Sequence, residues 1–188
     1  MDIIVKYIDE LLEKSTPEAP MWNIEKIRQG LKSNWNYIDG VMIKAVLQMY
    51  DVTKDEKYLK FADNFIDYRV HEDGTIDGYN IGEKNIDNVN AGKTLFELYD
   101  LTGKEKYRKA IDLVYSQIEI MPRCNNEARS FWHKDIYPNQ VWLDGMYMGQ
   151  PFYLEYETKF NNRKNYPDIF AQFKYCLLYT SPSPRDRG

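Results

Sequence analysis

The feature of this sequence that most constrains its fold is an internal repeat. The segment MYDVTKDEKYLKFAD, residues 49–63, aligns without a gap on LYDLTGKEKYRKAID, residues 98–112, at an offset of 98 − 49 = 49 residues. Each copy has the pattern of a helix, a short turn and a second helix, with the turn at Thr53 in the first copy and at Thr102 in the second. Such hairpins bury their apolar faces only against neighbouring hairpins. The repeat therefore predicts an all-α fold of stacked helical hairpins.

Other segments extend this pattern. Apolar spacing predicts an amphipathic helix over residues 3–12, a short helix within residues 22–32 and a looser third hairpin, with one helix over residues 144–156 and a second after Pro167. Two arrangements of such hairpins fit: an open α-solenoid, or a closed ring, the α/α toroid of many sugar-processing enzymes. The repeat alone does not choose between them.

The composition excludes several classes of function. The net charge of −4 gives no basic surface for nucleic acid. No apolar run approaches the ~20 residues that span a bilayer, and the acidic N-terminal segment is not a secretory signal. Two cysteines, Cys124 and Cys176, make neither a disulfide framework nor a metal site, and no phosphate-binding glycine loop is present. We expect a cytoplasmic protein that needs no metal or cofactor, and its oligomeric state stays open.

Residues 130–153 are the candidate functional segment, because aromatic and titratable side chains are interleaved there. They are Phe131, Trp132, His133, Lys134, Asp135, Tyr137, Trp142, Asp144, Tyr147, Phe152 and Tyr153. This mixture suits a cleft that stacks on the rings of a polar ligand while a carboxyl group acts on it. An aromatic-rich loop between helices, with Asp144 as an ordinary cap, fits equally well.

Three aspartates occupy similar places in the predicted hairpins. Asp39, Asp87 and Asp144 each lie at the presumed start of the first helix of a hairpin. We therefore expect three carboxylates to project from one end of the assembly, near helix N-termini that favour their ionised form. Asp is also a common helix cap, worth about 1 kcal/mol without any function.

Three strings carry a resemblance to a known family. FWHKDIYPNQVWLDGMYMGQPF (residues 131–152), IDNVNAGK (residues 86–93) and WNYIDG (residues 35–40) resemble glycoside hydrolase family 105, the unsaturated rhamnogalacturonyl hydrolases. The resemblance extends over nearly all of residues 34–175. It implies an (α/α)6 toroid of six hairpins, of which this chain supplies about half.

The resemblance also implies an activity. The family removes the Δ4,5-unsaturated galacturonyl residue from rhamnogalacturonan oligosaccharides by hydrating the C4=C5 double bond, without a metal or cofactor. By position, Asp144 matches the aspartate that protonates C4 and then assists water, and Asp87 matches the second acidic residue. We expect Trp142 and Tyr147 to shield Asp144. Four positions match ligand contacts, among them a cation for the sugar carboxylate and a stacking indole: Tyr37, His133, Lys134 and Trp142.

The C-terminal residues break from this pattern. The string CLLYTSPSPRD, residues 176–186, resembles a translated sequencing adapter. We expect residues 1–175 to be the N-terminal half of a single catalytic domain, with residues 176–188 non-native; a natural disordered tail is the alternative. Little activity is expected from half a ring.

Other functions remain open on this sequence. They are an unsaturated glucuronyl hydrolase, another α/α-toroid sugar enzyme, a conventional glycosidase that uses Asp87 and Asp144 in distinct roles, and an α-solenoid that only binds its ligand.

Overall fold

The structure, a computed structural model, describes residues 2–125 and 127–176, so the predicted tail from residue 177 onward lies outside the described residues. In chain order the elements are α1 (Asp2–Glu13), η1 (Met21–Asn23), α2 (Ile24–Arg28), α3 (Tyr37–Thr53), α4 (Glu56–Asp67), η2 (Ile81–Glu83), η3 (Ile86–Gly92), α5 (Lys93–Thr102), α6 (Glu105–Ile120), α7 (Leu143–Lys159) and α8 (Tyr166–Tyr175). Across the described part, extended pairing is limited to isolated bridges. The prediction of an all-α fold is confirmed.

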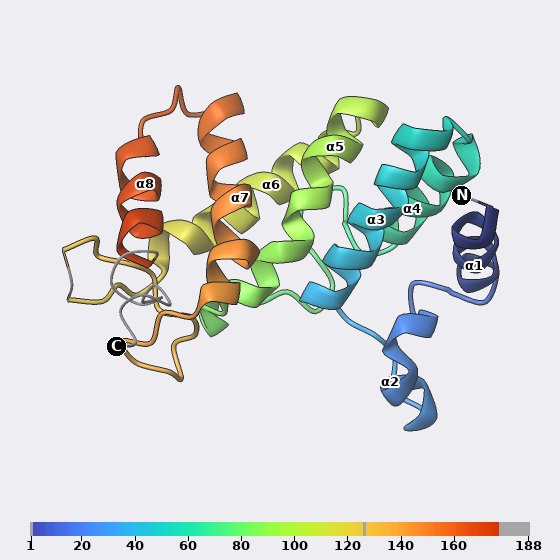
Figure 1. Cartoon of the computed structure of the whole chain (residues 1–188), viewed down its shortest axis with the longest axis horizontal. Helices are drawn as coiled ribbons and strands as arrows, with labels where there is room; N and C mark the ends of the chain where they lie inside the picture. The colour runs from blue at the N-terminus through green and yellow to red at the C-terminus, as the bar shows by residue number, and fades with distance from the viewer. Residues whose placement is uncertain (1, 126, 177–188) are drawn as a thin grey trace, which may run out of the picture.

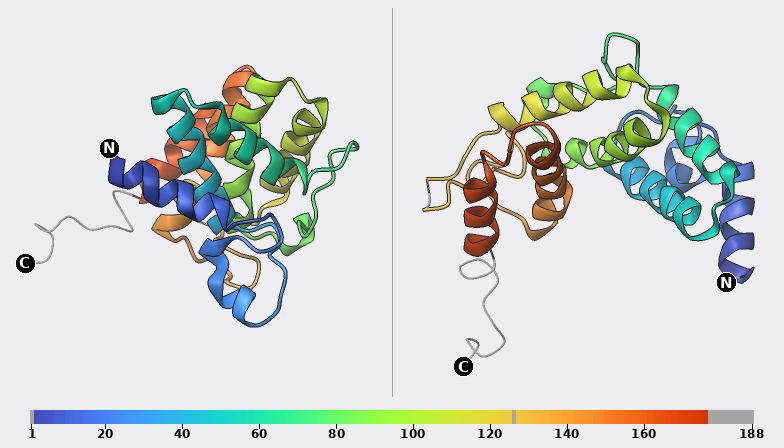
Figure 2. Two further views of the ribbon diagram at one scale, coloured as in Figure 1. Left: turned by 90° about the vertical axis from the view of Figure 1, so that its right-hand side faces the viewer. Right: turned by 90° about the horizontal axis from the view of Figure 1, so that it is seen from above.

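The hairpins α3–α4, α5–α6 and α7–α8 follow one another along a curved path (Figures 1 and 2). Seen from above, α3, α5 and α7 lie on the concave side of this arc, and α4, α6 and α8 lie on the convex side (Figure 2). The N-termini of α3 and α7 and the segment before α5 all lie toward the lower edge of the molecule in Figure 1. This edge is where the candidate residues gather.

The repeated sequence encodes the turn inside each hairpin. The Thr53 hydroxyl donates to the Met49 carbonyl at 2.6 Å, and the Thr102 hydroxyl donates to the Leu98 carbonyl at 2.6 Å. The residue after each threonine, Lys54 or Gly103, is left-handed and ends its helix. Both copies thus use the same cap, and these bonds give the turn a structural role.

A second repeated residue joins each hairpin to the one before it. Tyr58 in α4 is buried and donates to Asp9 of α1 at 2.9 Å. Its counterpart Tyr107 in α6 is buried and donates to Asp63 of α4 at 2.6 Å. The repeat therefore specifies the contact between each hairpin and a preceding helix, as well as the turn within the hairpin.

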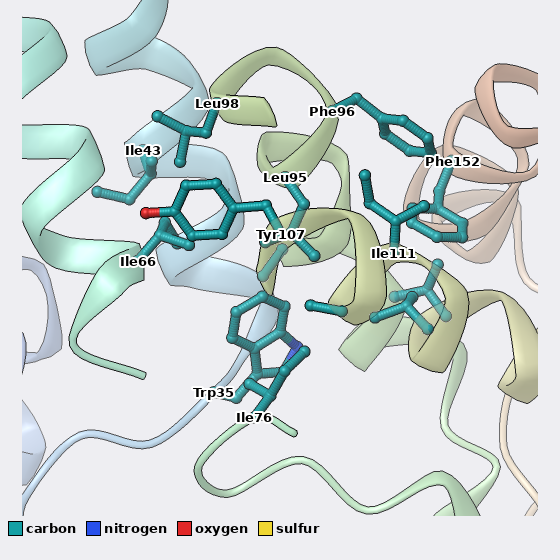
Figure 3. Packing of buried hydrophobic residues seen from close by; sticks show 14 of the residues in the cluster. Trp35, Ile43, Ile66, Ile76, Leu95, Phe96, Leu98, Tyr107, Ile111 and Phe152 are labelled. Atoms are coloured by element: carbon teal, nitrogen blue, oxygen red, sulfur yellow. The ribbon is translucent and has the colours of Figure 1, made fainter. Parts of the chain in front are cut away.

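The core fills the space between the two layers of helices. Leu95 and Phe96 of α5 pack with Ile111 of α6, and the Phe96 ring lies 5.1 Å from the Phe152 ring of α7 (Figure 3). Trp35 closes the lower side of this core, where its indole donates to the Asn88 carbonyl at 2.8 Å. The apolar contacts thus run without a break from α3 to α7. Among the described helices, none combines the length and the apolar character that crossing a membrane requires.

Helix α7 contains a proline that removes one of its backbone bonds. Pro151 has no N–H, so the carbonyl of Tyr147, four residues earlier, lacks its usual donor. The Lys93 ammonium of α5 donates to that carbonyl at 2.9 Å and lies 3.9 Å from the centre of the Tyr147 ring. Burial, with a smaller effect from Lys44, lowers the pKa of Lys93 to about 8. A side chain from the neighbouring helix thus replaces the missing donor.

Candidate active site

The site begins with a close approach between η3 and the first turns of α7. A Cβ on Gly149 would lie 2.6 Å from Ile86 Cδ1, and one on Gly145 would lie 3.3 Å from Ile86 Cγ2. Neither position tolerates a side chain without movement of its neighbours, because such contacts are shorter than packed atoms allow. The two glycines, four residues apart on one helix face, let η3 lie directly against α7. Asp87 and Asp144 are carried to the same place by this contact.

The loop before α7 adds two further side chains. It is held to η3 by an antiparallel bridge between Asn85 and Lys134, in which the Ile86 N–H donates to the His133 carbonyl at 3.0 Å. The His133 N–H in turn donates to the Gln140 carbonyl at 2.7 Å. These bonds fix the backbone on both sides of His133, so its side chain and that of Lys134 are directed by a rigid segment.

Asp87 is held as a carboxylate. Its Oδ2 lies 2.8 Å from the Lys134 ammonium and its Oδ1 lies 3.2 Å from His133 Nε2. Burial raises the pKa of Asp87, but the hydrogen bonds from His133 and Lys134 outweigh it and hold the pKa below the ordinary value. The Asn85 side chain accepts from the Asp87 N–H at 3.1 Å and so caps η3. Asp87 is therefore a fixed negative charge.

Asp144 has a different environment. It lies in the first turn of α7, its side chain is 57% exposed, and its Oδ1 accepts from the Gly145 N–H at 2.8 Å. The expected shielding by two aromatic rings is not seen, since Trp142 and Tyr147 are themselves 39% and 55% exposed. Both rings lie toward other partners: Trp142 stacks on His133, and Tyr147 lies under Lys93. Asp144 is thus open to solvent and to a ligand.

The two histidine nitrogens face the two carboxylates. His133 Nδ1 lies 3.9 Å from Asp144 Oδ1, while Nε2 faces Asp87. The side chain is 1% exposed, and its ring stacks on Trp142 with centroids 4.2 Å apart and planes inclined by 18°. A Cβ on Gly145 would lie 2.7 Å from Nδ1, so the helix also closes on the ring.

The remaining predicted ligand contacts lie at the margin of this cluster. The Trp142 ring stacks on the His133 ring, and its centroid lies 5.2 Å from that of the Tyr137 ring. Tyr37, the first residue of α3, is 42% exposed, and its carbonyl accepts from the Asn90 side chain of η3 at 2.8 Å. The structure thus brings Asp87, His133, Lys134 and Asp144 together, with Tyr37 on the adjacent helix start.

The prediction that three carboxylates project from one end was wrong for Asp39. Asp39 is 1% exposed and accepts from the Trp22 indole at 2.8 Å and from the Asn23 and Asn36 amides at 3.3 and 3.0 Å. Burial raises the pKa of its carboxyl. The segment containing η1 covers this helix start, so Asp39 holds that segment in place and faces no open space.

The geometry also bears on metal binding. Single ligand atoms of Asp87, His133 and Asp144 lie within 4.8 Å of one another, a spacing that the sequence pattern did not reveal. The Lys134 ammonium lies 2.8 Å from the Asp87 carboxylate and would repel a metal cation bound there. The charges therefore favour an organic ligand at this place, and we assign no metal to it.

A shallow depression next to the cluster offers space for the rest of a ligand. It has a volume of about 360 Å³ and is lined by Gly82, Glu83, Asn85, Lys134, Asp135 and Ile136. Lys134 thus binds the Asp87 carboxylate and borders this open space. A polar ligand bound at Lys134 has room to extend along η2.

Sequence reasoning missed two residues that shape the site, Gly145 and Asn85. The two glycines of the GMYMG string stand four apart, a spacing typical of close helix contacts, and Asn85 directly precedes η3, the usual place of a cap. Both signals were present but could not be connected without knowing that η3 lies against α7.

Comparison with known proteins agrees with this geometry. The profile of Glycosyl Hydrolase Family 88 matches residues 7–182. The chain is also similar to a solved glycoside hydrolase of family 105 from C. acetobutylicum ATCC 824, with 41% identity and a TM-score of 0.73 over 88% of this chain and 43% of that one. The chain thus spans less than half the length of this relative, and the likeness confirms the expected resemblance to family 105 and the α/α-toroid fold class. With a match that covers most of its length, this chain belongs to glycosyl hydrolase family 88.

Proposed function

We propose that this chain carries the acid–base site of a hydrolase that removes a Δ4,5-unsaturated galacturonyl residue from rhamnogalacturonan oligosaccharides. The observation that carries the proposal is the contrast between Asp144 and Asp87. Asp144 is exposed, whereas Asp87 is charged and is bound by Lys134 and His133. One carboxyl oxygen of Asp87 lies within 4.8 Å of one of Asp144. One carboxyl group can therefore exchange protons with a ligand while the other keeps its charge.

Hydration of an enol ether needs such a single exchanging group. Protonated Asp144 gives its proton to C4, and positive charge develops at C5 and the ring oxygen. Water adds to C5 and returns a proton to the Asp144 carboxylate, which restores the acid. The C5 hemiketal then opens to a ketone, and the hemiacetal left at C1 collapses to an aldehyde and releases the remaining sugar. Asp87, as a fixed negative charge, stabilises the cationic stage.

Lys134 has two candidate roles in this scheme. Its ammonium is bound to Asp87 at 2.8 Å, and its side chain borders the open depression beside the site. An incoming uronate carboxylate can therefore share the ammonium with Asp87. The tendency of lysine to act as a compact point charge suits such sharing between two carboxylates.

A conventional retaining glycosidase is the second candidate, because two carboxylates this close match the spacing of its acid and nucleophile. In that mechanism Asp87 would attack C1, yet both of its oxygens are engaged by cationic or donor groups. Two disaccharides that differ only in the C4=C5 double bond separate the mechanisms. Hydration consumes the unsaturated one alone, whereas displacement at C1 does not require the alkene.

The test uses the whole chain at high concentration with the unsaturated disaccharide, and follows the loss of the alkene ultraviolet absorbance. Asp144→Asn is expected to lower turnover about 10³-fold with little change in KM, because the amide cannot supply a proton. Asp51→Asn is the matched control. Asp51 lies near the C-terminal end of α3, is 61% exposed and pairs with Lys54 at 3.6 Å, so this variant should stay within about twofold of wild type.

Four results would count against the proposal. Unchanged turnover in Asp144→Asn removes Asp144 from the chemistry. Consumption of the saturated disaccharide favours the glycosidase, and faster consumption of an unsaturated glucuronyl substrate shifts the specificity to that sugar. Tight binding of the disaccharide by the wild-type chain, without any consumption, favours a binding module.

A further inference from the structure

His133 is nearly inaccessible, which separates it from the groups that can touch a ligand. Its side chain is 1% exposed, Trp142 covers one part of the ring, and the Gly145 backbone packs against Nδ1. Its backbone is bonded on both sides, to Ile86 and Gln140. A sugar could reach this ring only if the loop and α7 moved apart, so the geometry favours a role exerted through a neighbouring residue.

The neighbour on one side determines which nitrogen carries the proton. Nε2 lies 3.2 Å from Asp87 Oδ1, and Asp87 is a carboxylate that can only accept. The N–H of a neutral His133 is therefore at Nε2. Nδ1 is left with a bare lone pair, is buried, and has no hydrogen-bond partner among the described residues.

The neighbour on the other side is the exchanging acid. Asp144 Oδ1 is the carboxyl oxygen found 3.9 Å from Nδ1, too long for a hydrogen bond in the resting geometry. Asp144 is more than half exposed and its side chain has room to turn, so a small rotation closes this gap. Catalytic hydrogen bonds are often long before the ligand arrives. A bare nitrogen can bind Asp144 only when Asp144 is protonated, because two acceptors cannot bond.

We propose that His133 is a positioning residue that accepts a hydrogen bond from protonated Asp144 and holds the acid in place between turnovers. This inference rests on the function proposed above and assigns His133 a role that differs from direct sugar contact. Asp87 orients the imidazole, the imidazole orients Asp144, and Asp144 delivers its proton to C4. His133 neither gains nor loses a proton over the cycle, so the overall balance of the reaction is unchanged.

Two isosteric variants separate the two nitrogens. His133→Asn keeps an acceptor near the place of Nδ1 and loses the bond to Asp87, whereas His133→Gln keeps a donor near the place of Nε2 and loses the acceptor. We expect His133→Gln to lower kcat about 10²-fold and His133→Asn only about 10-fold, with KM within about twofold in both, because neither residue contacts the sugar. If His133 acts only by holding Asp87, His133→Asn should lower kcat more than His133→Gln does. A raised KM with unchanged kcat indicates direct sugar contact. Either result overturns the inference.

A third variant moves the ring without changing any titratable group. Gly145→Ala places a methyl group 2.7 Å from Nδ1 and must displace the imidazole. We expect it to lower kcat as His133→Gln does and to leave KM unchanged. Full activity in folded Gly145→Ala would contradict the proposed contact. Melting temperatures of all three variants show whether a loss of activity is a loss of folding.

A measurement without turnover keeps the two proposals distinguishable. The chain has two histidines, so imidazole ¹⁵N signals come only from His133 and His71. In the wild-type chain we expect the Nε2–H tautomer for His133, and we expect Asp144→Ala to move its Nδ1 signal while His71 stays unchanged as the internal control. A wild-type chain that binds the disaccharide tightly and leaves it intact overturns the hydrolase proposal. A His133 signal with the proton on Nδ1, or one that ignores Asp144→Ala, overturns the positioning role.

Discussion

The starts of α3 and α7 present the same residue type in opposite environments. In α3, the Asp39 carboxyl is 1% exposed and accepts from three uncharged donors. In α7, the Asp144 side chain is 57% exposed and accepts from its own helix. Between them, Asp87 in η3 is partly buried and bound to a cation. Three aspartates that the sequence places alike thus form a structural anchor, a fixed charge and an open acid.

The difference comes from what the chain lays over each helix start. The segment around Trp22 and Asn23 covers Asp39, while the loop with His133 and Lys134 covers Asp87 and leaves Asp144 open. An N-terminal helix position favours a carboxylate everywhere, but only the covering segment decides whether it holds structure or meets a ligand. The role of each aspartate is therefore determined by the segment that covers it, and not by its place at a helix start.

Removal of the buried carboxyl should have the largest effect on stability. Asp39→Ala leaves the Trp22 indole and two amides without their acceptor, which we expect to lower the free energy of unfolding by about 2–3 kcal/mol. Asp144→Ala is the matched control and should change it by less than about 0.5 kcal/mol, because that side chain is exposed. Urea denaturation measures both. Equal losses would mean that the two helix starts are not different in kind.

The pH dependence of stability should have opposite signs at Asp39 and Asp87. The pKa of Asp39 lies above 3.8, so its ionisation costs folding free energy as pH rises through the folded value. The pKa of Asp87 lies below 3.8, so its stabilising effect is present above 3.8 and is lost as pH falls through the folded value.

This sign difference is measurable with two amide variants. As pH rises through the region around 3.8, the stability of wild type relative to Asp39→Asn should fall, and that relative to Asp87→Asn should rise. The expected result is that the two slopes have opposite signs. Denaturation at a series of pH values gives both curves, and parallel curves would contradict the assigned environments.

The smallest effects concern two caps that stand 85 − 36 = 49 residues apart, the same distance as the two copies of the repeat. Asn36 accepts from the Asp39 N–H at 3.0 Å, and Asn85 accepts from the Asp87 N–H at 3.1 Å. We expect Asn36→Ala and Asn85→Ala each to cost about 1 kcal/mol in unfolding free energy. Only Asn85→Ala should also lower turnover of the unsaturated disaccharide, because it loosens Asp87. Loss of turnover in Asn36→Ala at full folding would make the first helix start part of the site.

Much of the fold followed from local sequence signals. The turns at Thr53 and Thr102 and the third hairpin were predictable because caps and apolar periodicity act over a few residues. The short 3-10 segment η3 before α5 was not predictable, because the sequence from Asp87 onward has the pattern of a single helix.

The candidate site was less predictable, because its contacts join distant parts of the chain. The resemblance pointed to Asp87, Lys134 and Asp144. No local pattern shows that Lys134 pairs with Asn85 in a β-bridge just before η3, or that its ammonium then binds Asp87. The burial of Asp39 likewise depends on Trp22, which lies outside the repeat. Helix periodicity indicates which face is apolar and gives no information on which loop will cover its end.

The lysine that completes the backbone of α7 has a consequence for how this chain can vary over generations. Pro151 and Lys93 lie far apart in sequence, yet they are coupled: Pro151 leaves a carbonyl of α7 without a backbone donor, and Lys93 supplies the donor. Loss of Lys93 alone leaves a carbonyl without a donor, and loss of Pro151 alone leaves a partly buried ammonium competing with a restored backbone N–H. We therefore expect the two positions to vary together, so that related chains keep both residues or replace both.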